Sequence, residues 1–353
     1  MNHKRVNAIS AYEFFLCLFV IFIHISAEGV TYGNRIGLFS GILFFLNKSL
    51  SFVVPAFIFA SALKLTLKYK DIRISPNYFV GRISKIYLPY LLWVAAYYVY
   101  FIVLHYLEYN LQDLVQYILT GTLAAHFYFV VIIMQFYILM PLFLFIAKKI
   151  PALAGLVGSF FLTIGYVFFS FTNPSIFNVL PGDRWFLGYL IFWMTGVYYA
   201  LHFEAVTTFA RRNKMIVLLP CAILLLTHVA LSYASYIGIY MYNPYFAQTM
   251  HLLFCIVTSC GFYLACLFCT EPFRNFFRNV GATTYYVYLS HLLVMFAVER
   301  FLLKPHFWLA HRFLIKALFV YCIPFVGAYL YILFKKRVGR FMSHKNNVKA
   351  EAI

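Results

Sequence analysis

Ten long apolar runs follow one another along the chain, and the short stretches between them carry most of the charged residues. A bilayer core of about 30 Å is crossed by about 20 helical residues, so each run predicts one membrane-spanning helix. The sequence therefore predicts an all-α polytopic membrane protein with about ten transmembrane helices. The predicted spans lie near residues 8–28, 40–63, 83–105, 125–147, 151–171, 185–203, 215–237, 248–269, 282–303 and 313–334.

Lysine and arginine are distributed unequally between the two sides of these spans. If the N-terminus is cytoplasmic, 21 of the 28 basic residues fall on the cytoplasmic side and seven on the outer side. Because the cytoplasmic loops of membrane proteins carry the excess of Lys and Arg, this distribution predicts that both termini are cytoplasmic. The net charge of +18 therefore indicates orientation in the membrane, and nucleic acid is not an expected partner.

The composition excludes an ordinary soluble domain, because 64% of the residues are hydrophobic and only 11% are charged. The first run is too long and too aromatic for a signal peptide, so we expect it to be retained. All seven cysteines fall within predicted spans, and the CxxC of Cys266 and Cys269 has no second ligand pair, so no metal site is predicted. We expect one transmembrane domain over residues 1–340 and a solvated cytoplasmic tail over residues 341–353.

The first span carries a histidine, His24, in its interior, and an acidic residue, Glu13, eleven positions earlier. An ionisable residue inside a membrane is costly and marks a functional site by default, and histidine can stay neutral and still move a proton. Eleven residues at 100° each bring both side chains to one helix face, about 16 Å apart along the axis. A packing histidine that hydrogen-bonds to a neighbouring helix explains His24 as well.

Two other spans contain histidines in polar surroundings. His291 follows Tyr288 and Ser290 in the ninth span, and His126 opens the fourth span, whose one polar interior residue is Gln135. Hydroxyl groups beside a histidine can form a proton network, or they can simply hold helices together. An interhelical hydrogen bond is the simplest explanation for Gln135.

A basic pair, Arg82 and Lys85, stands at the cytoplasmic entrance of the third span. Three residues apart on a helix, the two side chains are predicted to share one face, where they suit phosphate groups. Anchoring by the positive-inside rule and contact with lipid headgroups explain the pair as well. Pro89 just beyond predicts a kink or break in the helix, which membrane proteins tolerate where backbone lines a cavity.

The outer loop before the sixth span places Asp183, Arg184 and Trp185 next to one another after a Pro-Gly turn. An acid, a base and an aromatic ring at the extracellular mouth suit a sugar-like ligand. The alternative is an interfacial aromatic anchor beside an ion pair that stabilises the turn.

Together these motifs resemble the integral-membrane acyltransferase 3 family over nearly the whole chain. The family's first-helix histidine corresponds to His24, but Glu13 replaces the arginine usual eleven positions earlier. Its basic pair before Leu-Pro corresponds to Arg82 and Lys85, with Lys instead of the usual second Arg. The other matches are His126, Phe127, Phe129, Gln135, Phe136, Tyr137 and Pro141 in the fourth helix, Phe192 and Gly196 in the sixth, and Gly281, Thr284, Tyr288, Leu289 and His291 in the ninth.

Within the family, the runs RISKIYLPYLLW, FVVIIMQFYIL and VPAFIFASALKL are most similar to the intercellular-adhesin type of polysaccharide-modifying protein. The resemblance implies an enzyme that moves an acetyl or succinyl group from cytoplasmic acyl-CoA to a hydroxyl of a cell-surface polysaccharide or its lipid-linked precursor. It implies a bacterial plasma membrane, no bound cofactor, and acyl-CoA as co-substrate. The expected partners are the glycan acceptor, membrane lipids and a polysaccharide synthase complex.

This chemistry assigns roles to the candidate residues. A sugar hydroxyl that attacks a thioester needs a general base, for which we expect His24, with His291 or His126 as second base, orienter or acyl relay. Arg82 and Lys85 are expected to hold the phosphates of CoA. Asp183, Arg184 and Trp185 are expected to bind the acceptor, and Gln135 and Tyr288 have no assigned role.

Glu13 is unfavourable for an anionic donor, so either another cation takes over, or donor handling is altered or impaired. Two other classes remain open on physical grounds. One is a transporter or flippase that moves a glycan or lipid-linked sugar without chemistry, and the other is a structural partner of a synthase complex.

Overall fold

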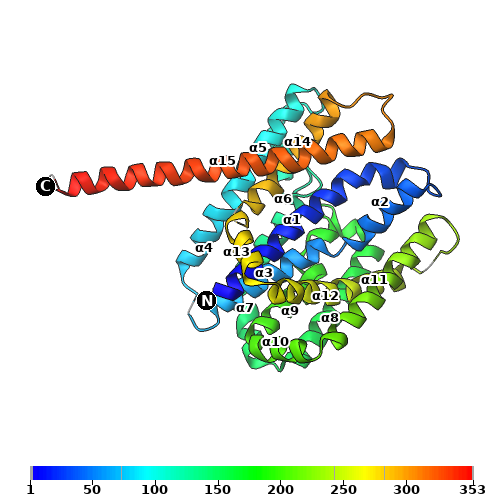
Figure 1. The fold of residues 1–353 in the computed structure, drawn as a ribbon, viewed down its shortest axis with the longest axis horizontal. Coiled ribbons are helices and arrows are strands. Elements are labelled where there is room, and N and C mark those ends of the chain that lie inside the picture. The colour runs from blue at the N-terminus through cyan, green and yellow to red at the C-terminus, as the bar shows by residue number, and fades with distance from the viewer. Residues whose placement is uncertain (1–2, 73, 242, 282, 352–353) are drawn as a thin grey trace.

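The computed structural model describes residues 3–72, 74–241, 243–281 and 283–351, and all regular secondary structure within them is helical (Figure 1). The α-helices are α1 (His3–Tyr32), α2 (Leu38–Ser49), α3 (Val53–Tyr69), α4 (Pro76–Arg82), α5 (Leu88–Val103), α6 (Leu111–Thr120), α7 (Tyr128–Lys149), α8 (Ala152–Thr172), α9 (Leu190–Leu201), α10 (Phe203–Arg212), α11 (Lys214–Tyr236), α12 (Pro244–Phe268), α13 (Glu271–Val280), α14 (Thr284–Phe301) and α15 (Leu309–Glu351). The shorter turns are η1 (Ile83–Tyr87), which is π-helical, and the 3-10 turns η2 (Pro174–Phe177), η3 (Gly182–Arg184) and η4 (Phe186–Tyr189). The predicted all-α polytopic fold is confirmed.

Eight helical segments of the described residues are long and apolar enough to cross a membrane. A ninth is added if Phe186–Leu201 and Phe203–Arg212, which are bent by 90°, count as one span. The predicted span near 282–303 corresponds to α14, which is not among the eight and carries Glu299 and Arg300 at its C-terminal end. All ten predicted spans lie on helical segments, whereas ten crossings and two cytoplasmic termini stay predictions.

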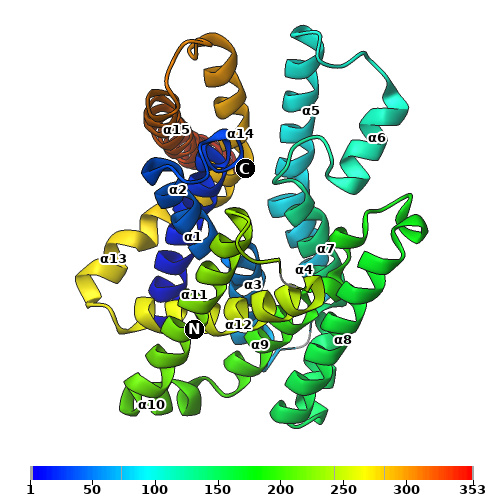
Figure 2. The ribbon, with the colours of Figure 1, turned by 90° about the vertical axis from the view of Figure 1, so that its right-hand side faces the viewer.

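The bundle is organised around α1, which packs against α2, α3, α12, α13, α14 and α15. Figure 2 shows α5, α6 and α7 on the opposite side, with α3 and α9 between the two groups. α3 and α9 approach closely because α9 has a glycine, Gly196, at their contact. A Cβ atom there would lie 2.5 Å from the carbonyl oxygen of Phe59, so only a glycine permits this approach.

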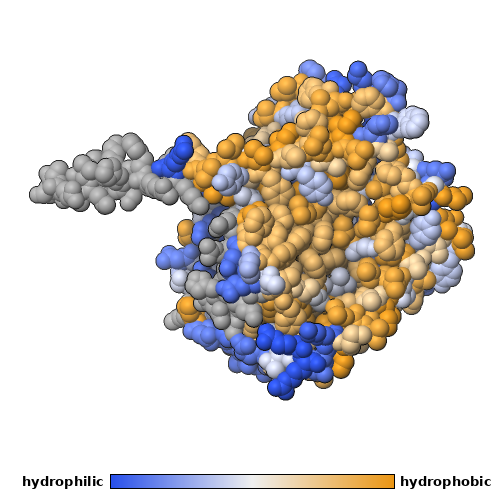
Figure 3. Space-filling model, viewed as in Figure 1, coloured by the Kyte–Doolittle hydropathy of each residue, from blue (hydrophilic) through white to orange (hydrophobic). Residues whose placement is uncertain are grey.

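The outer surface is suited to lipid. The face in Figure 3 is mostly hydrophobic, and its hydrophilic residues gather toward the edges. Large apolar side chains point outward from several spans, for example Leu92 and Phe161, each 65% exposed. α15 projects from this body (Figure 1) and continues beyond its predicted span through the predicted tail as far as Glu351. The division at residue 340 stays a prediction, and residues 352–353 lie outside the described residues.

Candidate active site

Three histidines that are distant in the sequence meet inside the bundle. His24 comes from α1, His291 from α14, and His126 from the segment just before α7. The ring centroid of His291 lies 5.3 Å from that of His24 and 4.9 Å from that of His126. His126 and His291 are buried and His24 is half-buried. The structure therefore brings together the three side chains to which the sequence pointed.

Backbone carbonyl groups orient two of these rings. His291 Nδ1 donates to the carbonyl oxygen of Tyr288 at 2.6 Å, and His126 Nε2 donates to that of Leu289 at 3.3 Å. His291 Nε2 and His126 Nδ1 are both buried and have no hydrogen-bond partner among the described residues. In a neutral imidazole the nitrogen that does not donate carries a lone pair, so each ring keeps one basic nitrogen free. A buried polar atom without a partner is rare unless function requires it.

Two tyrosines fix the backbone around the histidines. The hydroxyl of Tyr288 donates to the carbonyl oxygen of His126 and so ties α14 to the start of α7. The hydroxyl of Tyr97 donates to the carbonyl oxygen of Leu289 at 3.1 Å and accepts from the backbone N–H of Leu293 at 2.7 Å. Tyr288, which the sequence left without a role, therefore positions His126 and the backbone that holds His291.

A cavity of about 290 Å³ has Tyr288 in its wall. It is named the inner cavity because its residues lie toward the predicted cytoplasmic ends of the helices. Its lining residues are Glu13, Phe57, Ser61, Lys64, Leu65, Arg82, Ile86, Phe129, Ile133, Tyr137, Gly281, Thr284, Tyr285 and Tyr288. Lys64 contacts both carboxylate oxygens of Glu13 at 2.9 Å. The guanidinium carbon of Arg82 lies 5.6 Å from the ring centroids of Tyr78 and Tyr137, and Arg82 Nε is buried without a partner among the described residues.

The predicted pairing of Arg82 with Lys85 on one face is not observed. Lys85 is exposed and does not line the inner cavity. The π-helical turn η1 begins directly after Arg82, and its wider turn rotates Lys85 away from the face expected for a regular α-helix. The second cation in this cavity is instead Lys64, which the sequence suggested only as a topology signal.

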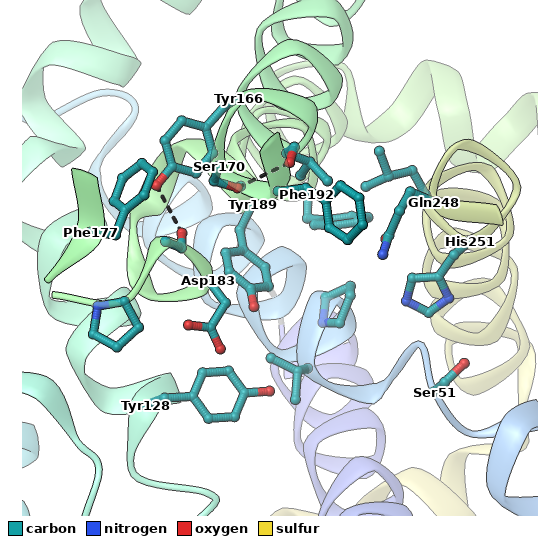
Figure 4. A pocket seen from close by; sticks show the side chains of 18 of the residues that line it. Ser51, Tyr128, Tyr166, Ser170, Phe177, Asp183, Tyr189, Phe192, Gln248 and His251 are labelled. Carbon is teal, nitrogen blue, oxygen red and sulfur yellow. Dashed lines mark hydrogen bonds between the residues drawn. The ribbon is translucent and has the colours of Figure 1, made fainter. Parts of the chain in front are cut away.

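A cavity of about 600 Å³, the outer cavity, lies toward the N-terminal ends of α3 and α7, the two helices that line both cavities (Figure 4). Its lining residues are Ser51, Val54, Pro55, Tyr128, Tyr166, Val167, Ser170, Phe171, Pro174, Phe177, Pro181, Gly182, Asp183, Gly188, Tyr189, Phe192, Gln248, His251 and Leu252. Of the three loop residues predicted to bind an acceptor, Asp183 lines this cavity, whereas Arg184 and Trp185 do not. Tyr166 holds the loop, because its hydroxyl donates to the carbonyl oxygen of Gly182 at 2.8 Å.

Arg184 and Gln135 have structural contacts. An Arg184 guanidinium N–H donates to the carbonyl oxygen of Thr120, and Arg184 Nε lies 3.6 Å from Asp183 Oδ1. Gln135 Nε2 donates to the carbonyl oxygen of Arg184 at 2.8 Å, and Gln135 Oε1 accepts from the N–H of Phe186 at 3.1 Å. Both side chains therefore brace the loop that carries Asp183. Trp185 is 38% exposed, and its indole N–H donates to the carbonyl oxygen of Leu180 at 3.4 Å.

Three adjacent rings form an aromatic layer in the wall of the inner cavity. The ring centroids of Phe57, Phe129 and Tyr288 lie 5.5–6.1 Å from one another. On α3, Pro55 lines the outer cavity and Phe57 lines the inner one. On α7, Tyr128 lines the outer cavity and its neighbour Phe129 lines the inner one. Tyr288 also contacts the rings of His126 and His291, at 5.2 and 5.8 Å. The histidines thus lie beside this aromatic layer, and none of the three lines either cavity as described.

Comparison with known proteins decides the family. A family model described as "Acyltransferase domain" (Acyl_transf_3) matches residues 7–333. The chain belongs to the acyltransferase 3 family. The predicted resemblance is therefore confirmed, and the three histidines, the inner cavity and Asp183 all lie within the matched region of an acyltransferase.

Several curated relatives of this acyltransferase 3 protein come from staphylococci. A Staphylococcus aureus (strain N315) protein is 23% identical over 290 residues, which cover 79% of each chain. A Staphylococcus epidermidis protein is 22% identical over 294 residues, which cover 80% of this chain and 79% of the relative. Both are named "Probable poly-beta-1,6-N-acetyl-D-glucosamine export protein". No solved structure matches the chain.

A charged network above His24 is a feature of this acyltransferase that the sequence did not reveal. Glu28, one helical turn after His24, accepts from Arg312 and from Lys316, each at 2.6 Å. Lys316 also donates to Glu299 at 3.3 Å and is only 1% exposed. The four-residue spacing of His24 and Glu28 was the one available signal. The network joins α1, α14 and α15, the first two of which carry His24 and His291.

Proposed function

We propose that this protein transfers an acetyl or succinyl group from cytoplasmic acyl-CoA to a hydroxyl of a cell-surface polysaccharide, or of its lipid-linked precursor, in a bacterial plasma membrane. The observation that carries the proposal is the closeness of three features: a cavity with two cations, three histidines that contact Tyr288 of its wall or one another, and a second cavity with aromatic walls. Membership of the acyltransferase 3 family and the polysaccharide named in the relatives' descriptions support it.

The inner cavity is suited to an anionic donor. CoA carries several phosphate groups, and Arg82 offers a buried Nε–H that has no hydrogen-bond partner among the described residues. Glu13 neutralises Lys64 when no ligand is present, and an incoming anion competes with Glu13 for the ammonium group. The cavity of about 290 Å³ receives the acyl-thioester arm, while the phosphates stay near Arg82 at the cytoplasmic end. Lys64 thereby supplies the positive charge that Glu13 does not.

The histidines suit acyl transfer between sites on opposite sides of the bilayer. His291 Nε2 attacks the thioester carbon, the C–S bond breaks, and the acyl group is held on the imidazole while the CoA thiolate leaves. The acceptor hydroxyl then attacks the acyl carbon and gives its proton to His24, which restores His291. The proton finally neutralises the thiolate, so the products are the O-acylated glycan and CoA. His126 holds the second free nitrogen and orients the reacting groups.

Access to the histidines requires movement of the aromatic layer. Phe57, Phe129 and Tyr288 close the path between the cavities, and His126 and His291 are buried behind them. A closed layer excludes water from a reactive acyl intermediate. Displacement of Tyr288 by the acyl arm opens the shortest route from the inner cavity to His291.

The experiment incubates purified protein in lipid nanodiscs with labelled acetyl-CoA or succinyl-CoA and with membrane glycans. We expect label on the glycan and stoichiometric release of free CoA thiol. Release of CoA thiol without labelled glycan, or neither product with either donor, would contradict the transfer.

The second candidate is export of a glycan without chemistry, which the relatives' names favour. Two cavities arranged end to end also suit a translocation path. Proteoliposomes that move a glycan oligomer in the absence of acyl-CoA would favour export. Acylation without movement of the oligomer would favour the transferase.

A further inference from the structure

The outer cavity has walls suited to sugar rings. Six aromatic side chains surround it, contributed by α7, α8, α9 and the turns before α9. They are Tyr128, Tyr166, Phe171, Phe177, Tyr189 and Phe192. In Figure 4 the rings of Tyr128, Tyr166 and Phe177 lie on the side of the cavity away from Gln248 and His251, with Tyr189 and Phe192 between them. Flat apolar rings pack against the C–H faces of a pyranose, and a volume of about 600 Å³ is within the range of small-ligand sites.

Polar groups stand at two ends of this cavity. The Asp183 carboxylate lies between the rings of Tyr128 and Tyr189 at one end, and Gln248 and His251 of α12 face Ser51 at the other (Figure 4). Ser51 Oγ donates to the carbonyl oxygen of Lys48 at 2.8 Å and lies 3.4 Å from His228 Nε2, which leaves it one lone pair for a ligand donor. The Gln248 amide can both donate and accept. This end therefore suits hydroxyl or amide groups and requires no charge on the ligand.

The charge of the cavity is the discriminating feature. Asp183 is the one acidic residue in the lining, and no lysine or arginine of the described chain lines it. Its nearest cation, Arg184, is 3.6 Å away at Nε and is directed to the carbonyl oxygen of Thr120 outside the cavity. An acidic sugar would place a second carboxylate beside Asp183, and Arg184, which is already paired with Asp183 and bonded to Thr120, would be the one cation to offset both, so the second carboxylate is disfavoured.

We propose that the outer cavity is a subsite for neutral or amine-bearing hexose chains, and that Asp183 excludes chains of acidic sugars. Asp183 accepts hydrogen bonds from hydroxyl or amide N–H groups of a neutral sugar, and it forms an ion pair with the ammonium group of an amino sugar. The inference rests on the proposed function, because it names the class of acceptor that would reach the histidines.

The test measures binding by calorimetry in nanodiscs, without any acyl donor. The probes are hexamers of N-acetylglucosamine, of glucosamine and of galacturonic acid. We expect the first two to bind at least tenfold more tightly than the third. Asp183→Asn should weaken binding of the glucosamine hexamer about tenfold. It should also reduce the protein's preference for this hexamer over the galacturonic acid hexamer. The matched control, Glu108→Gln on an exposed outer loop, should change none of the three.

A second variant protects the test against a misfolded Asp183→Asn protein. Phe177→Ala removes one wall and should weaken all three hexamers by a similar factor, because it removes stacking and no charge. The proposal is overturned if the galacturonic acid hexamer binds as tightly as the other two, or if a folded Asp183→Asn protein keeps the full preference.

The binding experiment and the acyl-transfer experiment can fail independently of each other. Binding in the expected order without acyl transfer would contradict the proposed transfer and leave the subsite standing. Acyl transfer to membrane glycans by a protein that binds none of the hexamers would contradict the subsite alone.

Discussion

His291 and His126 lie 4.9 Å apart, ring centroid to ring centroid, and each donates one ring N–H to a backbone carbonyl of the same turn of α14. The acceptors are the carbonyl oxygens of Tyr288 and Leu289, which are adjacent in the sequence. One helical turn therefore sets the orientation of both rings and leaves one nitrogen of each without a hydrogen-bond partner in the described part of the chain. In each ring one nitrogen therefore holds the ring in place, and the other is the candidate for chemistry.

One substitution at His291 tests whether the ring has a chemical role beyond its backbone contact. Asn can donate to the Tyr288 carbonyl as Nδ1 does, but it has no counterpart of Nε2. We expect His291→Asn to fold like the wild type and to lose acyl transfer by about 10²–10⁴-fold, the usual loss for a proton-transfer or nucleophilic group. The checks are the transfer rate and the thermal unfolding midpoint. A folded His291→Asn protein with unchanged transfer would show that Nε2 takes no part.

Arg82 and Lys85 form a matched pair for testing the donor site. Arg82→Ala should raise the KM for acyl-CoA about tenfold or more, because a charge-assisted hydrogen bond contributes about 1.5–3 kcal/mol. Lys85→Ala should leave the KM unchanged, because Lys85 is exposed and lies outside the inner cavity. Initial rates at varied acyl-CoA concentration measure both. Equal effects of the two substitutions would assign the cations to headgroup binding instead of donor binding.

The aromatic layer makes a prediction about water. Phe57→Ala should increase the hydrolysis of acyl-CoA in the absence of acceptor, because it opens the barrier between the cavities. The control is Phe161→Ala on the lipid-facing surface, where Phe161 is 65% exposed, and it should leave hydrolysis at the wild-type level. Release of CoA thiol without acceptor is the measurement. Hydrolysis that is unchanged in Phe57→Ala would argue against the barrier.

The charged network above His24 makes a prediction about stability. Lys316→Met removes the buried cation that pairs with Glu28 and Glu299, and we expect the free energy of unfolding to fall by about 3 kcal/mol. The control is Lys304→Met, at an exposed position of the same outer region. Thermal unfolding of both variants in detergent provides the comparison. A Lys316→Met protein as stable as the control would mean that the network does not hold the three helices together.

The sequence was sufficient to single out candidate residues by their type, but not to predict which of them lie in contact in the fold. His24, His126 and His291 could be singled out because each is a polar residue in an apolar span, but their contact depends on how α1, α7 and α14 pack. Lys64 looked like one of many cytoplasmic lysines, and only the turn of α3 that faces Glu13 distinguishes it.

Lys85 was paired with Arg82 on the assumption of a regular α-helix. The assumption fails because η1 is a π-helical turn, which the sequence did not predict, although Pro89 predicted an irregularity nearby. For Arg184 the sequence left open a sugar-binding motif and an ion pair that stabilises the turn, and its observed contacts are those of the second. Local charge patterns thus gave the candidates, and backbone irregularity and loop contacts decided which of them line a cavity.

The central claim is that His24 acts in acyl transfer at the meeting point of the three histidines. The most direct measurement is transfer of label from acyl-CoA to membrane glycan by His24→Ala, with His306→Ala on the exposed loop between α14 and α15 as the control. We predict that His24→Ala abolishes transfer at normal expression and normal unfolding temperature, while His306→Ala retains the wild-type rate. Wild-type transfer by a folded His24→Ala protein would contradict the claim.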